Sequence, residues 1–140
     1  MAPEIIAVGE ALVEIMRPER ELPLDRPGPF VGPFPSGAPA IFADAAARLG
    51  AKAGFIGVVG EDDFGLCLRR RLEQDGVDLS CLRRSSEHTT GCAFVAYFAD
   101  GSRRFIFHLR HAAAGMLGPE DVQPAYVQGA RFLHVMGSAL

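Results

Sequence analysis

The sequence predicts an α/β fold in which a parallel sheet, covered by helices on both faces, is joined to a small second β-sheet. Two apolar runs rich in β-branched residues, Glu4–Gly9 and Ala53–Gly60, alternate with two helical patterns, Ala38–Leu49 and a run from about Asp63 to Gln74. The order strand, helix, strand, helix is typical of a parallel sheet with right-handed crossovers. A hairpin pattern later in the chain predicts the second sheet.

The N-terminal strand, Glu4–Gly9, is apolar at its centre and stops at a glycine, and Ala11–Met16 is expected to continue it. The segment from Pro18 to Pro39 is rich in proline and glycine, so it cannot form the interior of a helix. It predicts extended and turn structure with short edge strands, for example near Phe30-Val31.

The two helices differ in how their apolar residues are arranged. The first begins near Pro39 and is apolar over a wide arc, which predicts that it is largely buried. Its apolar positions are Ile41, Phe42, Ala45, Ala46 and Leu49. In the second helix, Phe64, Leu68 and Leu72 recur at every fourth position and predict a core stripe. The acidic residues at its start are interpreted as helix caps, with Asp62 or Asp63 as the capping residue.

A β-hairpin is predicted from Gly91–Ala99 and Arg103–Leu109, because Asp100-Gly101 between them is a strong turn signal. Strand alternation places His108 and Arg110 on the same face of the second run. The first run is apolar on both faces, so we expect both to be covered, by this domain and by a partner chain or a ligand.

The C-terminal part predicts short helical turns within Pro119–Gln128 and a buried-type strand at Phe132–Met136. Domains of this class rarely end just past a central strand. We therefore expect the chain to be the N-terminal part of a longer protein, or an incomplete sequence of one.

The composition is that of a soluble globular protein: 140 residues, 49% hydrophobic and 22% charged. A net charge of −3 argues against a broad nucleic-acid-binding surface. No apolar stretch approaches the roughly 18 residues needed to span a membrane. The N-terminus lacks the basic region of a signal peptide, so we expect a cytoplasmic protein.

The three cysteines, Cys67, Cys81 and Cys92, have no C-x-x-C spacing, which argues against a zinc site or a disulfide framework. We expect all three to be small buried hydrophobic residues in a reducing compartment. No metal-binding residues are predicted. A dinucleotide-binding protein is also disfavoured, because no G-x-G-x-x-G motif follows a strand.

The segment Ser36-Gly37-Ala38-Pro39-Ala40 carries the strongest chemical signal. Gly37 lets the backbone approach another group closely. The amides after it lie at the predicted start of a helix, and free amides there suit an oxygen-rich ligand. After the helix come Arg48-Leu49-Gly50 and then Gly60-Glu61-Asp62-Asp63-Phe64-Gly65.

This order resembles the first signature of the PfkB/ribokinase-like carbohydrate kinases, which reads Gly-Gly-Ala-Pro-Ala-Asn, an alanine-rich helix, Ala-Arg-Leu-Gly and Gly-Asp-Asp-x-Phe-Gly. The resemblance continues through Thr89-Thr90-Gly91 and Asp100-Gly101-Ser102-Arg103 and covers essentially the whole chain. Two further stretches, Val8–Glu14 and Phe105–Arg110, are most similar to the 2-keto-3-deoxygluconate kinase and fructokinase-like branch.

The resemblance implies that residues 1–140 are the N-terminal part of a ribokinase-like domain, with lid strands at about 18–35 and 90–110. It implies ATP-dependent phosphorylation of a hydroxyl on a small sugar or keto-sugar acid, with ATP and Mg²⁺ needed by the full-length enzyme. The apolar second face of the lid in turn predicts a homodimer formed through the β-lid.

The resemblance further implies which residues bind substrate. Gly37 and Ala38 would contact sugar hydroxyls through the backbone, and His108 and Arg110 would reach the substrate from the lid. From the residues alone, Arg110 is equally open to interpretation as a solvated strand-end arginine, and His108 as a structural histidine.

Two positions depart from the family pattern. Glu14 stands where many members have an aspartate for vicinal hydroxyls, and Ile41 stands where a sugar-binding asparagine is usual. Isoleucine cannot hydrogen-bond a hydroxyl, so a sugar would lose a hydrogen-bond partner at this position.

The family's anion hole and catalytic base lie in a Gly-Ala-Gly-Asp segment, and no such segment occurs in this chain. We therefore expect no catalytic residue here and no ATP bound by this chain alone, because phosphoryl transfer depends on positioning and charge stabilisation. The alternative is a non-catalytic sugar-binding or scaffold protein derived from the same fold.

Overall fold

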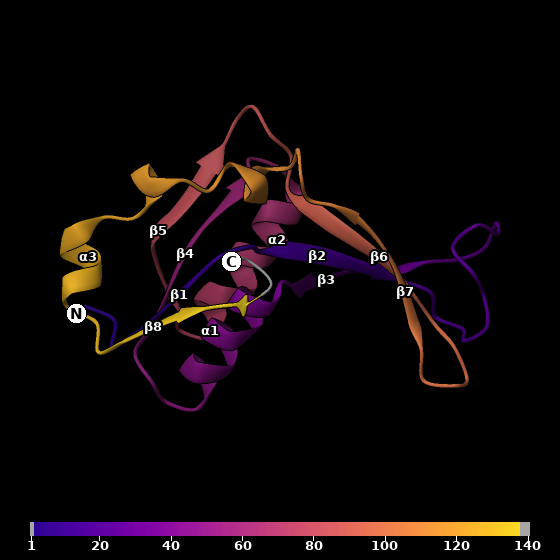
Figure 1. Cartoon of the computed structure of the whole chain (residues 1–140), viewed down its shortest axis with the longest axis horizontal. Helices are drawn as coiled ribbons and strands as arrows, with labels where there is room; N and C mark the ends of the chain where they lie inside the picture. Colours follow the sequence, from indigo (N-terminus) through magenta and orange to yellow (C-terminus); the bar gives the residue numbers. More distant parts are fainter. Residues whose placement is uncertain (1, 138–140) are drawn as a thin grey trace.

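The computed structural model describes residues 2–137 and has two four-stranded sheets lying end to end (Figure 1). The first sheet is parallel, with strand order β5 (Asp78–Ser85), β4 (Ala53–Gly60), β1 (Ile5–Val8) and β8 (Phe132–Val135). The second sheet is mixed, with strand order β3 (Val31–Ser36), β2 (Leu12–Met16), β6 (Gly91–Tyr97) and β7 (Arg103–His108). Both the α/β class and the hairpin are confirmed.

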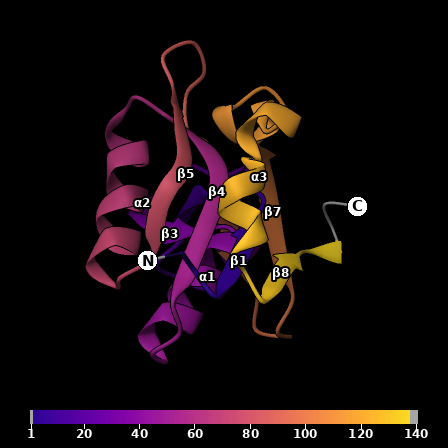
Figure 2. The same cartoon turned by 90° about the vertical axis from the view of Figure 1, so that its left-hand side faces the viewer.

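Helices cover both faces of the first sheet (Figure 2). On one face lie α1 (Ala38–Arg48) and α2 (Asp63–Gln74), and the fully buried Leu68 of α2 confirms the predicted core stripe. On the other lie the short helices η1 (Ala113–Met116), η2 (Pro119–Asp121) and α3 (Pro124–Gln128). Among residues 2–137, no helix has the length and hydrophobicity needed to cross a membrane.

The expected continuation of the first strand through Ala11–Met16 is wrong. The chain turns at Gly9, where φ is 148°, and β2 enters the second sheet between β3 and β6. Both runs are apolar because each packs into a core, so the hydrophobic pattern could not reveal the turn between them.

The edges of the first sheet also differ from expectation. The strand β5 was not predicted, because the polar residues in its sequence hide the pattern of an edge strand. The strand at Phe132–Met136 exists as β8, but it is not a buried one. As the opposite edge strand it leaves Phe132 and Leu133 56% and 54% exposed.

The burial expected for α1 is wrong as well. Ile41 and Leu49 are 52% and 88% exposed, while the small residues Pro39, Ala40 and Ala43 face the sheet. Small side chains let a helix lie close to a sheet, so its larger apolar residues remain outside the contact. The cysteines are free as expected, but only Cys81 is buried; Cys67 and Cys92 are half-buried.

A set of hydrogen bonds, here called the Asp62–Thr90 latch, joins the two sheets. Asp62 caps α2: its carboxylate accepts the Gly65 amide at 2.8 Å and the Thr90 amide at 2.7 Å. The Thr90 hydroxyl in turn accepts the Gly60 amide at 2.8 Å. The latch thus holds the end of β4, the start of α2 and the start of β6 together. Burial raises the pKa of Asp62, but the amide hydrogen bonds outweigh it and hold that pKa below its usual value.

A second crossing between the sheets lies at Gly37, between β3 and α1. Its φ is 99°, and a Cβ there would lie 2.6 Å from the Glu10 carbonyl oxygen. Only glycine fits this conformation and this close approach. The crossing therefore depends on Gly37 for backbone geometry, whatever the residue binds.

We predict that Asp62→Ala lowers the free energy of unfolding by about 2–4 kcal/mol, because a helix cap is lost and the Thr90 amide loses its acceptor. Asp63→Asn, at an exposed neighbouring position, should cost about 0.5 kcal/mol. Urea denaturation measures both. Because the pKa of Asp62 is lower in the folded than in the unfolded state, its ionised carboxylate stabilises the fold fully at pH values above the unfolded pKa of about 3.9. This stabilisation is lost as the pH falls through the folded-state pKa. Equal effects of the two variants would contradict the latch.

We predict that Gly37→Ala destabilises the fold by at least about 2 kcal/mol more than Gly76→Ala. Both glycines have a positive φ, but a Cβ at Gly76 would meet no atom within 4 Å. The comparison isolates the close approach to Glu10 from the cost of the backbone conformation. Chemical denaturation of the two variants measures the difference, and similar losses would refute the close approach.

Candidate sugar-binding site

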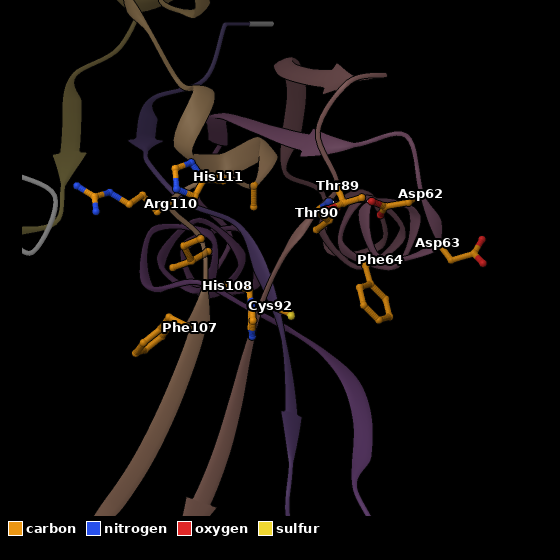
Figure 3. A pocket seen from close by; sticks show the side chains of 12 residues that line it. Asp62, Asp63, Phe64, Thr89, Thr90, Cys92, Phe107, His108, Arg110 and His111 are labelled. Atoms are coloured by element: carbon orange, nitrogen blue, oxygen red, sulfur yellow. Dashed lines mark hydrogen bonds between the residues drawn. The ribbon is translucent and has the colours of Figure 1, made fainter. Parts of the chain in front are cut away.

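A cavity of about 780 Å³ lies where the second sheet meets the carboxyl end of β4 and the start of α2 (Figure 3). Crevices at the carboxyl ends of parallel strands are the usual ligand sites of such sheets. The lining comes from the start of α2, the start of β6 and the end of β7 with the turn after it. It consists of Asp62, Asp63, Phe64, Thr89, Thr90, Cys92, Phe107, His108, Leu109, Arg110, His111 and Ala112.

Strand register explains how the side chains are distributed around the cavity. Cys92 and His108 are register partners on β6 and β7, so they share one face of the second sheet. In Figure 3 they lie next to each other, with Phe107 on the other side of β7. Arg110 and His111 lie on one side of the cavity, and Asp62 and Asp63 on the other (Figure 3). Residues of opposite charge thus lie on the two sides of the cavity, and the Arg110 side chain extends away from the other lining residues (Figure 3).

The two sides differ in how far their charges are satisfied. Asp62 is occupied by the latch, because both of its carboxylate oxygens accept backbone amides. In the described part of the chain, Arg110 takes part in none of the ion pairs, which involve only Arg69, Arg71, Arg83 and Arg131. An unpaired guanidinium at a cavity suits a carboxylate or a set of hydroxyls.

The cavity contains no activated nucleophile. Burial raises the pKa of the Cys92 thiol, which keeps it protonated at neutral pH. Across residues 2–137 there is no group of three His, Cys, Asp or Glu side chains able to hold a metal ion.

Two of the predicted substrate-binding residues, His108 and Arg110, line this cavity together. They were predicted to share one face of a strand, but β7 ends at His108 and Arg110 lies in the following turn. Glu14 lies elsewhere: it is in register with Ala93, which is paired with Phe107. Glu14 and His108 therefore point to opposite faces of the second sheet.

The other three predicted residues are on or next to α1. Gly37 caps the helix and Ala38 is its first residue, and neither is among the lining residues of the 780 Å³ cavity. Ile41 borders a smaller cavity of about 190 Å³ between α1 and α2. There Arg71 bridges Asp44 of α1 at 3.3 Å and Asp75 at 2.5 Å, so the charges beside Ile41 are already paired.

The candidate site contains residues that sequence reasoning missed. His111 is the clearest, because His108, Arg110 and His111 fall within four positions and could have been noticed as a basic cluster. Asp62 was assigned to capping alone. Its bond to Thr90 joins residues 28 positions apart, which no local pattern reveals.

Comparison with known proteins identifies relatives that are named as kinases. A fructokinase from Salmonella typhimurium is 37% identical over 140 residues, which is 100% of this chain and 42% of that protein. A provisionally assigned Ribokinase II from Escherichia coli superposes with a TM-score of 0.95 at 43% identity, over 99% of this chain and 44% of that one. A fructokinase from Xylella fastidiosa, solved with bound ATP, has a TM-score of 0.81 at 33% identity, over 96% and 42%.

The chain thus spans about two fifths of the length of these relatives. The model of the pfkB family carbohydrate kinases matches residues 2–140, which is nearly the whole chain. Fold, motif order and sequence similarity agree, and the chain belongs to the pfkB family of carbohydrate kinases.

Proposed function

We propose that this chain supplies the sugar-binding and lid part of a carbohydrate kinase. The observation that carries the proposal is the cavity at the carboxyl end of β4, roofed by β6 and β7, with the unpaired Arg110 beside His108 and His111. Relatives that are fructokinases support a sugar as the ligand. The acceptor is a hydroxyl of a sugar or of a keto-sugar acid, whose carboxylate Arg110 would pair.

The contacts proposed for the sugar have unequal support. His108 and Arg110 share the cavity, whereas Glu14, Gly37, Ala38 and Ile41 are absent from its lining. The roles of those four as sugar contacts stay predictions. A ligand touching both Glu14 and His108 would have to pass around the end of the sheet, because these side chains point to opposite faces.

The sequence has no Gly-Ala-Gly-Asp segment, which in the family carries the anion hole and the catalytic base. A structural neighbour from Escherichia coli was solved in complex with ATP and Mg²⁺, and this chain covers 43% of it. We propose that the residues handling ATP lie outside these 140 residues, and we assign no step of phosphoryl transfer to this chain.

We also propose that the second sheet forms a homodimer interface and that the protein acts in the cytoplasm, where free thiols persist. Phe34 and Phe107 are 43% and 57% exposed on one face of this sheet, and Phe105 stacks on Phe107 with 5.2 Å between ring centroids. Exposed aromatic clusters mark interaction surfaces.

For the binding role, we predict that Arg110→Ala weakens binding of a sugar acid such as gluconate by about 10- to 100-fold, because a charged hydrogen bond is lost. Binding of fructose should change less, since it has no carboxylate. Arg104→Ala is the control, because Arg104 is an exposed arginine on the same hairpin outside this cavity. Isothermal titration calorimetry measures the affinities of the wild type and of both variants for each ligand.

If Arg110→Ala and Arg104→Ala bind gluconate equally well, the proposed site is wrong. The same preparation should show no ATP-dependent phosphorylation of either ligand. Measurable turnover by the 140-residue chain would overturn the proposal that the ATP-handling residues lie outside it. Absence of any sugar binding would instead favour the scaffold alternative.

For the dimer, we predict that Phe34→Ser shifts the protein towards monomers by removing an exposed aromatic residue from the sheet face. Leu49→Ser removes a more exposed apolar side chain from the end of α1 and serves as the control. Sedimentation equilibrium measures the dimer dissociation constant, and a wild-type protein that stays monomeric would rule out this interface.

A further inference from the structure

The most unusual buried group outside the cavity is the guanidinium of Arg17, which follows β2 and is 3% exposed. It donates to the carbonyl oxygens of Pro29 and Pro23 at 3.0 Å each and to that of Arg26. Within residues 2–137 it has no carboxylate partner, and its Nε donates to no acceptor. A buried cation whose hydrogen bonds all go to backbone carbonyl oxygens holds the loop between β2 and β3 around itself.

The same guanidinium lies over an aromatic ring. Its central carbon is 3.9 Å from the ring centroid of Phe30, at the end of that loop. Cation–π contact of this kind is strongest where the cation is desolvated, as it is here. Phe30 is itself 40% exposed, so its position comes from Arg17 on one side and from a ring on the other.

That second ring belongs to Phe94 on β6, and it leads to the cavity. Phe30 and Phe94 pack edge to face with centroids 5.5 Å apart and planes at 73°. Phe94 and His108 pack in the same way at 5.9 Å and 82°. Phe94 and His108 are diagonal neighbours on antiparallel strands, because Cys92 is the register partner of His108.

We propose that Arg17, Phe30 and Phe94 form a positioning relay that sets the orientation of the His108 imidazole in the cavity. His108 is exposed at the end of an edge strand, and on its β6 side it has two neighbours: Cys92, its register partner, and the Phe94 ring, the aromatic group packed against the imidazole. The loop between β2 and β3 therefore acts on the cavity without touching it. The effect on ligand affinity rests on the proposed binding role, whereas the orientation of the ring does not.

The test is nuclear magnetic resonance of the ligand-free protein with labelled histidine and phenylalanine. The chain has four histidines, so His108→Gln assigns the His108 signals by their loss. In the wild type we expect a nuclear Overhauser effect between the Phe94 and His108 rings and a ring-current shift of the His108 Cε1 proton. Phe30 lies two contacts away from His108. Phe30→Leu should weaken the Overhauser effect and move the chemical shift of the His108 Cε1 proton towards the value of a free histidine. Phe30→Tyr keeps the ring and should restore both.

Phe105→Leu is the matched control, because it removes a ring from the same hairpin on the opposite face and should leave the His108 signals unchanged. If Phe30→Leu leaves them unchanged, or if Phe105→Leu moves them equally, the relay is refuted.

A gluconate titration then reports on affinity. Loss of one aromatic contact should weaken binding by about 2- to 12-fold in Phe30→Leu and not in Phe30→Tyr. Failure of gluconate to bind any variant counts against the proposed function, and the ring measurement then decides the relay by itself.

Discussion

The arrangement of the whole structure depends on one carboxylate, that of Asp62. One of its oxygens caps α2 by accepting a hydrogen bond from the Gly65 amide. The other accepts a hydrogen bond from the amide of Thr90, the residue before β6. Because Thr90 also accepts the Gly60 amide, one strand of each sheet and the helix α2 meet within hydrogen-bonding distance. Polar groups that lose water here regain partners only if the sheets keep this mutual orientation. The position of the cavity between the sheets follows from that orientation.

The two sheets that meet at this junction differ in burial: the first is largely buried and the second is more exposed. The first sheet is packed on both faces, with Phe55 on one side and Ile56 on the other completely buried. The second sheet extends away from it (Figure 1) and is held at its far end by the buried Arg17. Its strand β7 is an edge strand with mostly exposed residues. A cover of this kind, anchored at both ends and open along its edge, suits a site that must admit a ligand.

The sequence located much of this fold because its signals are local. The strand Ala53–Gly60 and the helix ending at Gln74 occur within the predicted limits, as does the hairpin around Asp100-Gly101. The failures share a cause. Whether Phe132 is buried, whether Leu12–Met16 turns into another sheet and which face of α1 meets the sheet all depend on neighbours distant in the sequence. Periodicity states that a residue is apolar, but it does not state what packs against it.

The features of the candidate site also fall into those that the sequence predicted and those that only the tertiary structure shows. The sequence by itself determined the family, the order of the elements and the presence of His108 and Arg110 near one strand end, because motifs and strand periodicity are read along the chain. Only the tertiary structure decided that Glu14 and His108 face opposite ways, that Asp62 binds Thr90 and that Arg17 reaches His108 through two aromatic rings. Each of these depends on strand register and on contacts across tens of residues. Such contacts are set by the balance of burial and hydrogen bonding over the whole chain, which no local pattern records.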